Sequence, residues 1–419
     1  MSKGITNRLF KGDKVTWIIF AALFALSFVE VFSATSRLTF RSESYWYPIT
    51  MHVRFMAMGF VAAWITHNLP MTWFKKLAYV AYWGGLALLV YATFFGQTKN
   101  DASRWVTIMG FSIQASEFAK LGLIMMVANF LGDWQSDLET GARTMGKILI
   151  ATGMVCGLTF TTNLSTTLLV CFIIYLMMLL GKLPRALMLK FTGICILSGG
   201  LLGATIMMIP PSSVKDTKLE RVITWQNRVK DFLPFFKSEA EKKKSDDGKS
   251  DQRVHANIAI ASSGIIFGKG PGNSVQRDFL PEAYSDLIYA IIIEEWGLII
   301  GCIGVLLLYL TLLYHTGQIA KNCDDPFATY LALGSALMIG THALFHMTIS
   351  VGLGPITGQP LPLVSRGGSS IIVNCIYIGM ILSISRYARE LRIAKERAKH
   401  NKTDKADINP LVEAATEEP

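Results

Sequence analysis

The chain has 419 residues, of which 51% are hydrophobic and only 17% are charged, and its formal net charge is +10. Soluble domains carry about 25% charged residues, so this composition excludes a disordered protein, a nucleic-acid-binding protein and an ordinary cytosolic enzyme. Much of the positive charge falls beside apolar segments, where Lys and Arg set the orientation of a membrane protein.

Ten apolar runs approach the length of about 20 residues that a transmembrane helix requires. They predict an all-α, polytopic integral membrane protein with about ten transmembrane helices. The fifth and sixth runs meet at residues 161–163, which favours a broken hairpin there. The predicted spans are 15–37, 49–68, 77–97, 117–133, 146–162, 164–181, 187–209, 286–314, 328–352 and 367–386.

The distribution of Lys and Arg over the short loops predicts that both termini are cytoplasmic. The expected organisation is a cytoplasmic N-terminus (1–14), a transmembrane domain (15–386) and a cytoplasmic tail (387–419) that begins as a helical extension of the last span. One long loop, 210–285, between the seventh and eighth helices then falls on the outer side. Its middle, 237–251, is polar and predicted to be mobile, and the amphipathic stretch 221–236 is expected on the membrane surface or against the bundle.

Ionisable groups inside spans are costly, so each one is a candidate functional residue. Glu30 and Arg54 are interpreted as groups near a span end or as a mutual ion pair. Glu117 and Lys120 lie three residues apart on one helix face. They either neutralise each other or form a cationic wall for an anionic ligand, with Lys120 binding phosphate.

Two further pairs lie inside predicted spans. Glu294 and Glu295 fall two turns into span eight, where partners inside the bundle are expected. His342 and His346 have a spacing that suits metal ligation, but the sequence offers no third ligand. A packed or hydrogen-bonded role is therefore favoured for both histidines.

Two outer loops, 264–286 and 352–370, are dense in Gly and Pro, which fix loop shape and let backbone approach a ligand closely. The second loop is apolar and is expected to dip into the membrane, where irregular backbone is tolerated only if it is buried or lines a cavity. Its 367–370 segment opens span ten beside Arg366, a natural anion site at a helix N-terminus. Asp286 stands at the predicted first turn of span eight, where the residues alone favour a carboxylate facing the helix dipole.

At these motifs the chain resembles the SEDS family (shape, elongation, division and sporulation) of multi-pass peptidoglycan glycosyltransferases. The similarity covers roughly 13–390 and is closer to the family's cell-division member than to its elongation member. The chain departs from the usual family pattern at Arg366, Asn163 and His346. The motifs that carry the resemblance are Ser103 to Trp105, Phe111 to Lys120, Gly268 to Asp286 and Pro355 to Ser370.

The resemblance implies a reaction that joins the 4-hydroxyl of one lipid II sugar to the anomeric carbon of another, with the undecaprenyl pyrophosphate leaving. Such a site needs a carboxylate near the hydroxyl, cations for the pyrophosphate and an apolar groove for the lipid. Asp286 is then the catalytic residue, as a base or as a metal ligand, and Mg²⁺ or Mn²⁺ is a candidate cofactor. The residues expected to contact substrate are Arg104, Glu117, Lys120, Glu282, Ser365, Arg366, Gly367, Gly368 and Ser369.

By resemblance, the protein also works at the division septum with other divisome proteins and with a class B penicillin-binding transpeptidase, whose single span is expected against spans eight and nine. Glycines there would permit close helix approach. The alternatives are a lipid II flippase that uses charges at mid-depth, an elongation-type polymerase, and a scaffold that only recruits a partner. The glycines in question are Gly297, Gly301, Gly304, Gly334 and Gly340.

Overall fold

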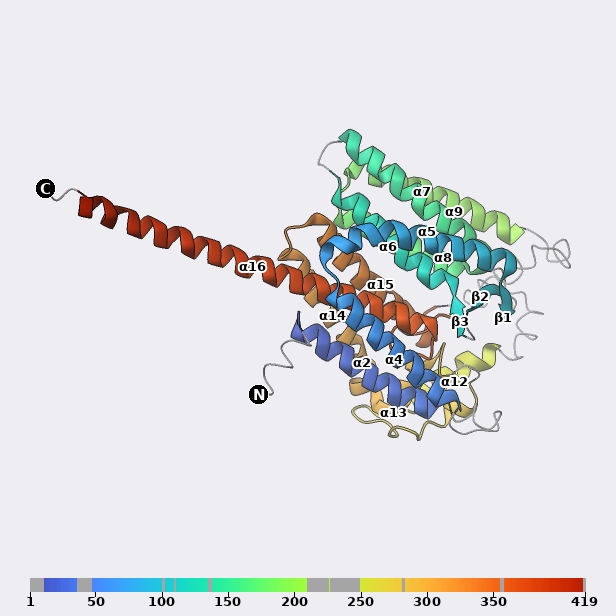
Figure 1. The fold of residues 1–419 in the computed structure, drawn as a ribbon. Helices are drawn as coiled ribbons and strands as arrows, with labels where there is room; N and C mark the ends of the chain where they lie inside the picture. The colour runs from blue at the N-terminus through green and yellow to red at the C-terminus, as the bar shows by residue number, and fades with distance from the viewer. Residues whose placement is uncertain are drawn as a thin grey trace.

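Long helices run side by side through the molecule, and the last one extends far beyond the others (Figure 1). The computed structural model describes residues 11–35, 47–99, 102–108, 111–134, 138–208, 226, 249–280, 283–354 and 358–416. The helices in the first half of the chain are α2 (Lys14–Ala34), α4 (Tyr47–Asn68), α5 (Met71–Phe95), α6 (Ala115–Gly132), α7 (Leu138–Thr162), α8 (Leu164–Leu180) and α9 (Arg185–Met208). Those of the second half are α12 (Lys249–Ala261), the short η3 (Gln276–Asp278), α13 (Ile288–Gly297), the π-helical η4 (Leu298–Gly304), α14 (Val305–Lys321), α15 (Pro326–Ser350) and α16 (Ser369–Thr416).

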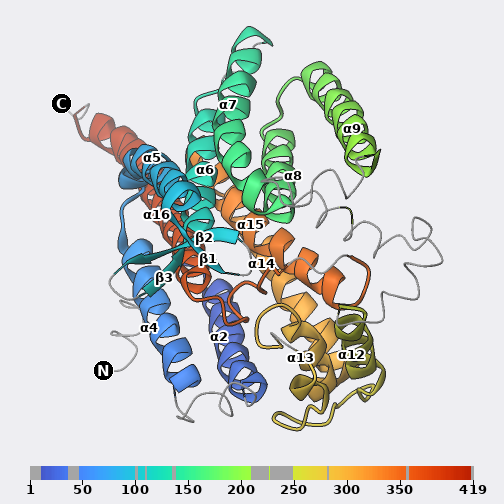
Figure 2. The same cartoon turned by 90° about the vertical axis from the view of Figure 1, so that its right-hand side faces the viewer.

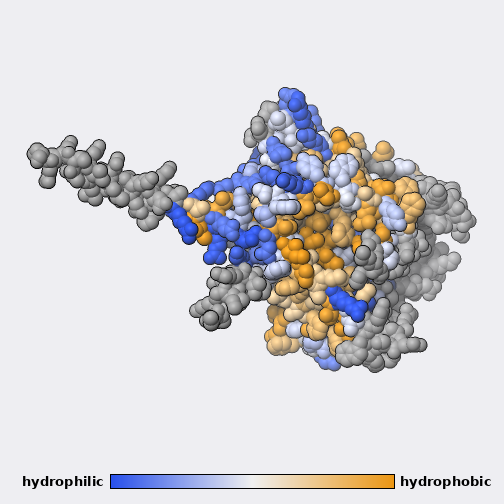
Figure 3. Space-filling model, viewed as in Figure 1, coloured by the Kyte–Doolittle hydropathy of each residue, from blue (hydrophilic) through white to orange (hydrophobic). Residues whose placement is uncertain are grey.

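Each of the ten predicted spans coincides with a helix or a helical series, so the all-α membrane fold is confirmed. Within the described residues, seven helical segments are long and apolar enough to cross a membrane, and α8 is a shorter apolar helix. Hydrophobic residues cover much of the side of the bundle, while hydrophilic ones gather where α16 leaves it (Figure 3). The most buried of the seven are α6, α15 and α16, so these three form the centre of the bundle.

Polar residues immediately before several helices define where those helices begin. The Asp13 carboxylate accepts from the Thr16 backbone N–H at 2.8 Å, and Asp325 does the same for Phe327 at 3.0 Å. Asn163 caps α8 in this way and separates it from α7, which confirms the predicted break in the hairpin. Side-chain acceptors at this position satisfy backbone donors that the first turn leaves unpaired.

A small antiparallel sheet lies beside α5 and α6 and was not predicted. Its strands are β1 (Gln97–Lys99), β2 (Ala102–Ile108) and β3 (Phe111–Gln114), in the order β1-β2-β3. The sequence of β2 ends in aromatic and β-branched residues, which favour strands. The sheet lies at the end of the bundle at which α2 ends and α6 and α16 begin, called the site end below. This end is on the right in Figure 1 and faces the viewer in Figure 2.

The predicted eighth span is broken. Gly297 has a φ of 88°, a left-handed conformation that favours glycine, and it separates α13 from η4. The loop that contains Gly264 and Lys269 fills the break, because Lys269 N–H donates to the Glu294 carbonyl at 3.0 Å and Leu298 N–H donates to the Gly264 carbonyl at 3.0 Å. Glu294 and Glu295 lie about two turns into α13 at the site end, and both are buried. Glu294 bonds to Lys269 and Glu295 to Ser33 near the end of α2, so the prediction that they have partners inside the bundle is confirmed.

The glycines predicted to receive a partner helix are largely used inside this chain. A Cβ on Gly334 would meet Met177 and Ile124, and one on Gly340 would meet Leu313. A Cβ on Gly301 would lie 2.6 Å from the Ile292 carbonyl oxygen. The prediction of a glycine-lined partner surface is therefore wrong at these positions, because the space that the glycines leave is filled by neighbouring helices.

This packing makes Gly301 and Gly304 a matched pair for measurement. Gly301→Ala is expected to lower the unfolding free energy by about 1–3 kcal/mol, the usual cost of overpacking. Gly304→Ala is expected to change it by less than about 0.5 kcal/mol, because the nearest atom to its added Cβ lies 3.7 Å away. Thermal unfolding of the two purified variants in one detergent checks this, and equal stability would contradict the packing described for η4.

Candidate active site

Asp286 lies in a turn before α13, two residues ahead of the first helical residue, Ile288. The predicted position in the first turn of the helix is thus slightly wrong. The side chain is half-buried, and its Oδ1 accepts from the Ser285 hydroxyl at 3.0 Å. Its Oδ2 faces Gly358, where an added Cβ would lie 3.2 Å away. The carboxylate therefore lies directly against the loop that precedes α16.

Two motifs that are far apart in the sequence meet at this turn. The Ser365 hydroxyl donates to the Ser285 carbonyl at 2.7 Å and accepts from the Leu361 backbone N–H at 2.7 Å. Arg366 N–H donates to the Tyr284 carbonyl at 3.0 Å, and its guanidinium lies 5.4 Å from the centre of the Tyr284 ring. A cation thus lies over the turn that carries Asp286.

The loop 358–368 is buried in the bundle, as its apolar sequence predicts. Leu361, Leu363 and Val364 are each at most 1% exposed. The Val364 carbonyl accepts from the Ser27 hydroxyl at 2.8 Å, and Ser27 also contacts the His52 ring nitrogen at 3.0 Å. The expectation that this segment is buried is therefore confirmed, and residues of α2 and α4 contact it.

The start of α16 at Ser369 agrees with the predicted opening of the tenth span by residues 367–370. The Ser369 hydroxyl accepts from the Gln114 backbone N–H at 2.9 Å and so joins β3 to α16. Gly367 and Gly368 are half-buried beside it. Ser365 and Ser369 therefore hold the loops together in this structure, and their predicted contact with substrate remains a prediction.

Glu117 and Lys120 form a closed ion pair near the start of α6. Lys120 Nζ lies 2.7 Å from Glu117 Oε1, and the two side chains are 1% and 3% exposed. His342 interacts electrostatically with Lys120, and Tyr377 does so with Glu117. The structure thus shows the mutual neutralisation that the spacing allowed, and a cationic wall would require this pair to open.

The two histidines of α15 have a packed role, as favoured from the sequence. His342 and His346 are each 1% exposed, and His346 Nδ1 lies 2.7 Å from the Gln359 carbonyl oxygen. Gln359 also donates from its amide to the Thr166 hydroxyl at 2.8 Å. In the part of the chain that is described, no group of three or more His, Cys, Asp and Glu residues could hold a metal. Gln359 thus connects the loop to α8 and α15. This residue was not singled out from the sequence, and its position in the loop was the only signal for it.

Buried carboxylates fix the loop that leads to Asp286. Glu294 accepts from Lys269 Nζ at 2.6 Å and from the Ser274 hydroxyl at 2.5 Å. Glu295 accepts from the Ser33 hydroxyl, and Glu30 accepts from Trp296 Nε1 at 2.5 Å.

Arg54 is exposed on α4, so the mutual pair suggested for Glu30 and Arg54 is wrong. Glu30 of α2 bonds to Trp296 of α13 instead, and Glu295 of α13 bonds to Ser33 of α2. Glu294 of α13 bonds to Lys269 of the loop.

Several predicted features lie outside the described residues. Glu282 is one of them, as is the side chain of Arg104, although the backbone of Arg104 belongs to β2. The amphipathic stretch 221–236 is also outside, apart from residue 226. Most of the polar stretch 237–251 is outside too, and its last three residues begin α12. The roles predicted for Arg104 and Glu282 remain predictions.

Known proteins resemble this chain over most of its length. Residues 13–390 match the family model of FtsW, RodA and SpoVE, described as "Cell cycle protein". A protein of Pseudoalteromonas translucida named "Probable peptidoglycan glycosyltransferase FtsW" is 31% identical, with 86% of each chain covered. The "Stage V sporulation protein E" of Bacillus subtilis is 28% identical, with 92% of this chain and 100% of that protein covered.

Solved structures share the fold. A chain in the structure described as "Structural coordination of polymerization and crosslinking by a peptidoglycan synthase complex" matches with a TM-score of 0.70 at 23% identity, covering 90% of this chain and 98% of that chain. The rod shape determining protein RodA of Thermus thermophilus matches with a TM-score of 0.60 at 21% identity, covering 90% and 97%.

These matches define a class of multi-pass membrane protein. The chain belongs to the FtsW/RodA/SpoVE family, the SEDS family of peptidoglycan glycosyltransferases, as expected from the sequence.

Proposed function

We propose that this protein polymerises lipid II into glycan strands at the outer face of the cytoplasmic membrane. One observation carries the proposal: the half-buried Asp286 carboxylate lies against the Gly358–Arg366 loop, with the Arg366 cation over the adjoining Tyr284 ring. A general base and a cation for a leaving pyrophosphate are thus held side by side by two converging loops. Family membership supports the same chemistry.

The proposed reaction begins at the 4-hydroxyl of an acceptor sugar. Asp286 takes the proton of this hydroxyl as its oxygen attacks the anomeric carbon of the donor. The new glycosidic bond forms while the bond from that carbon to the lipid pyrophosphate breaks, and the pyrophosphate leaves with the bonding electron pair. Arg366 stabilises the charge that develops there, and Lys120 would add a second cation if the Glu117 pair opened.

A divalent cation, Mg²⁺ or Mn²⁺, fits the residues that are present. Mg²⁺ is usually held by one or two carboxylates together with substrate phosphates, and Asp286 offers one half-buried carboxylate beside the proposed leaving group. Asp286 and the substrate would hold the ion, which when bound would stabilise the charge on the pyrophosphate.

The flippase alternative is less well supported by the placement of the charges. A transport path needs ionisable groups at mid-depth on facing spans. Among the described residues, Glu117 and Lys120 lie in the first two turns of α6, and Glu295 lies beside Ser33 at the end of α2. These groups gather at the site end, which favours chemistry at one membrane face.

The orientation and the cellular role are part of the proposal. The Lys and Arg pattern favours a cytoplasmic position for both termini, which would put the site end outside. The FtsW names among the relatives favour septal synthesis over elongation. A class B penicillin-binding transpeptidase is the proposed partner, in line with the complex described for a related fold.

The test is the purified chain supplied with lipid II alone. Glycan strands that a muramidase digests are expected, with a further increase in rate when the transpeptidase is added. Translocation of lipid II across vesicles without any strand would contradict the proposal and favour the flippase.

A further inference from the structure

Gln359 is bonded to two helices at once, although it lies in an irregular loop. Its side-chain amide donates to the Thr166 hydroxyl of α8 at 2.8 Å, and its carbonyl oxygen lies 2.7 Å from His346 Nδ1 on α15. A carbonyl oxygen only accepts, so this Nδ1 carries the proton. The Gln359 side chain also interacts with His342, one turn earlier on α15. Because Gln359 is only 4% exposed, the loss of a partner would leave a buried polar group unsatisfied, which is costly.

The residue immediately before Gln359 borders the carboxylate of Asp286. Gly358 has a φ of 64°, a left-handed conformation that favours glycine, and a Cβ at this position would lie 3.2 Å from Asp286 Oδ2. The peptide bond that joins Gly358 to Gln359 is planar and rigid, so a displacement of Gln359 also displaces Gly358. The place of Gly358 beside the carboxylate is therefore set by the bonds of Gln359.

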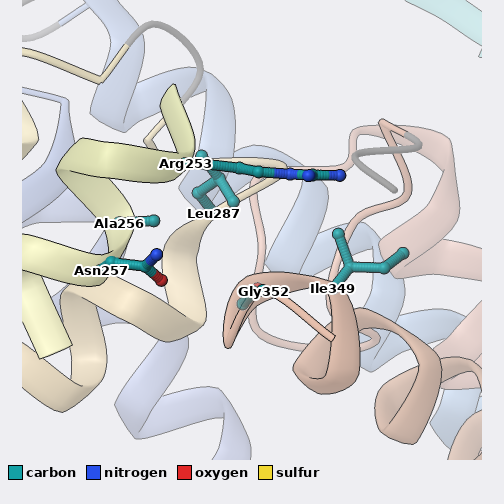
Figure 4. Close-up of a pocket in the computed structure, with 7 residues that line it drawn as sticks. Arg253, Ala256, Asn257, Leu287, Ile349 and Gly352 are labelled. Atoms are coloured by element: carbon teal, nitrogen blue, oxygen red, sulfur yellow. The ribbon is translucent and has the colours of Figure 1, made fainter. Parts of the chain in front are cut away.

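The end of α15 is a neighbour of the turn that carries Asp286. Ile349 and Gly352, at this end, line one small surface pocket together with Leu287, the residue that follows Asp286 (Figure 4). His346 lies about one turn before Ile349 on the same helix. The carbonyl that His346 binds is thus held by a helix that also approaches the turn of Asp286.

Asn163 and His346, where the chain departs from the usual family pattern, are linked through Gln359. At the start of α8, Asn163 Oδ1 accepts from the Thr166 backbone N–H at 3.3 Å. The Thr166 hydroxyl accepts from the Gln359 amide, and the Gln359 carbonyl accepts from His346. The hydrogen bonds thus form one series from α8 through the loop to α15, so the loop has a fixed place between two helices.

We propose that Gln359 is a positioning residue that holds Gly358 against Asp286 through its bonds to α8 and α15, and so keeps the carboxylate in place for the acceptor hydroxyl. This inference rests on the proposed function, because it concerns the base of the same site. A misplacement of about 1 Å at a reacting group can cost about 10²-fold in rate. The bonds of Gln359 should therefore affect the rate of the chemical step more than the binding of lipid II.

The test measures steady-state polymerisation by two single variants and their combination. Gln359→Leu removes the amide, and Thr166→Val keeps the shape of the side chain but removes the hydroxyl that accepts from it. Each is expected to lower kcat by about tenfold or more, with KM and the affinity for lipid II in nanodiscs changed much less. The double variant is expected to lower kcat no further than Gln359→Leu alone, because both substitutions remove the same bond.

Two substitutions on α8 serve as matched controls. Thr166→Ser retains the hydroxyl and is expected to keep the wild-type kcat. Thr167→Val removes a buried hydroxyl from the adjacent residue, which is 6% exposed and bonds to the Thr159 hydroxyl rather than to Gln359. It is also expected to keep the wild-type kcat, which separates the bond to Gln359 from a general effect of removing a hydroxyl from this helix.

Modification of Asp286 by a water-soluble carbodiimide tests the position of the loop without turnover. The reaction, followed by the mass of the peptide that contains Asp286, is expected to be faster in Gln359→Leu and in Thr166→Val than in wild type, because Gly358 then moves away from Oδ2. Asp278 is the internal control, since its side chain is 57% exposed and should react at the same rate in every variant.

An unchanged kcat in Gln359→Leu, multiplied effects in the double variant, or equal carbodiimide reactivity of Asp286 in wild type and Gln359→Leu would overturn the proposal. Failure of the wild-type chain to polymerise lipid II would contradict the proposed function separately, because the carbodiimide comparison requires no polymerisation.

Discussion

Asp286→Asn is expected to reduce glycan-strand synthesis by about 10²–10⁴-fold, because the amide retains the size of the side chain but cannot take the proton of the acceptor hydroxyl. Loss of a metal ligand at this position would cost more. The fold should tolerate the change, since Asp286 lies before α13 and its bond from Ser285 is available to an amide oxygen as well. Polymerisation of lipid II by the purified variant is the measurement.

Asp278→Asn is the matched control for this substitution. Asp278 is in the same loop, eight residues earlier, with its side chain 57% exposed and 3.9 Å from Arg277. We expect it to retain near wild-type activity. A near wild-type rate in Asp286→Asn would contradict the catalytic assignment.

Lys120→Met is expected to lower the unfolding free energy by about 3–5 kcal/mol, because it leaves a buried carboxylate without its partner. Glu117 is only 3% exposed and lies 2.7 Å from the ammonium group. The double variant Glu117→Gln with Lys120→Met removes both charges and is expected to recover most of this stability. Thermal unfolding of both purified variants checks the difference.

The double variant also separates structure from chemistry. If Lys120 binds the pyrophosphate after the pair opens, the double variant should be stable but strongly impaired in polymerisation. A stable double variant with wild-type activity would restrict the pair to a structural role and remove Lys120 from the substrate site.

The sequence predicted the spans well because the membrane imposes one simple requirement, a long apolar helix. The same reasoning located the buried loop before α16, since an apolar segment rich in Gly and Pro has to be buried between helices. The convergence of Asp286 with Ser365 and Arg366 was expected only through the family resemblance, because contacts between residues about 80 positions apart leave no local pattern.

Other features followed from tertiary contacts that no single segment specifies. The break at Gly297 depends on backbone bonds from the loop around Gly264 and Lys269, so the apolar run alone looked continuous. Gly301 and Gly334 lie in two spans where glycine would let a partner helix approach closely. Helices of the same chain occupy that space instead.

The most direct test of the central claim, that glycan synthesis takes place at the outer face beside Asp286, is the sidedness of the product. The chain is reconstituted in vesicles, oriented by protease access to its C-terminal tail, and supplied with lipid II. With the tail inside, we predict strands that an added muramidase digests without detergent, and none with Asp286→Asn. Strands that are protected until detergent is added, or strands made equally by Asp286→Asn, would contradict the claim.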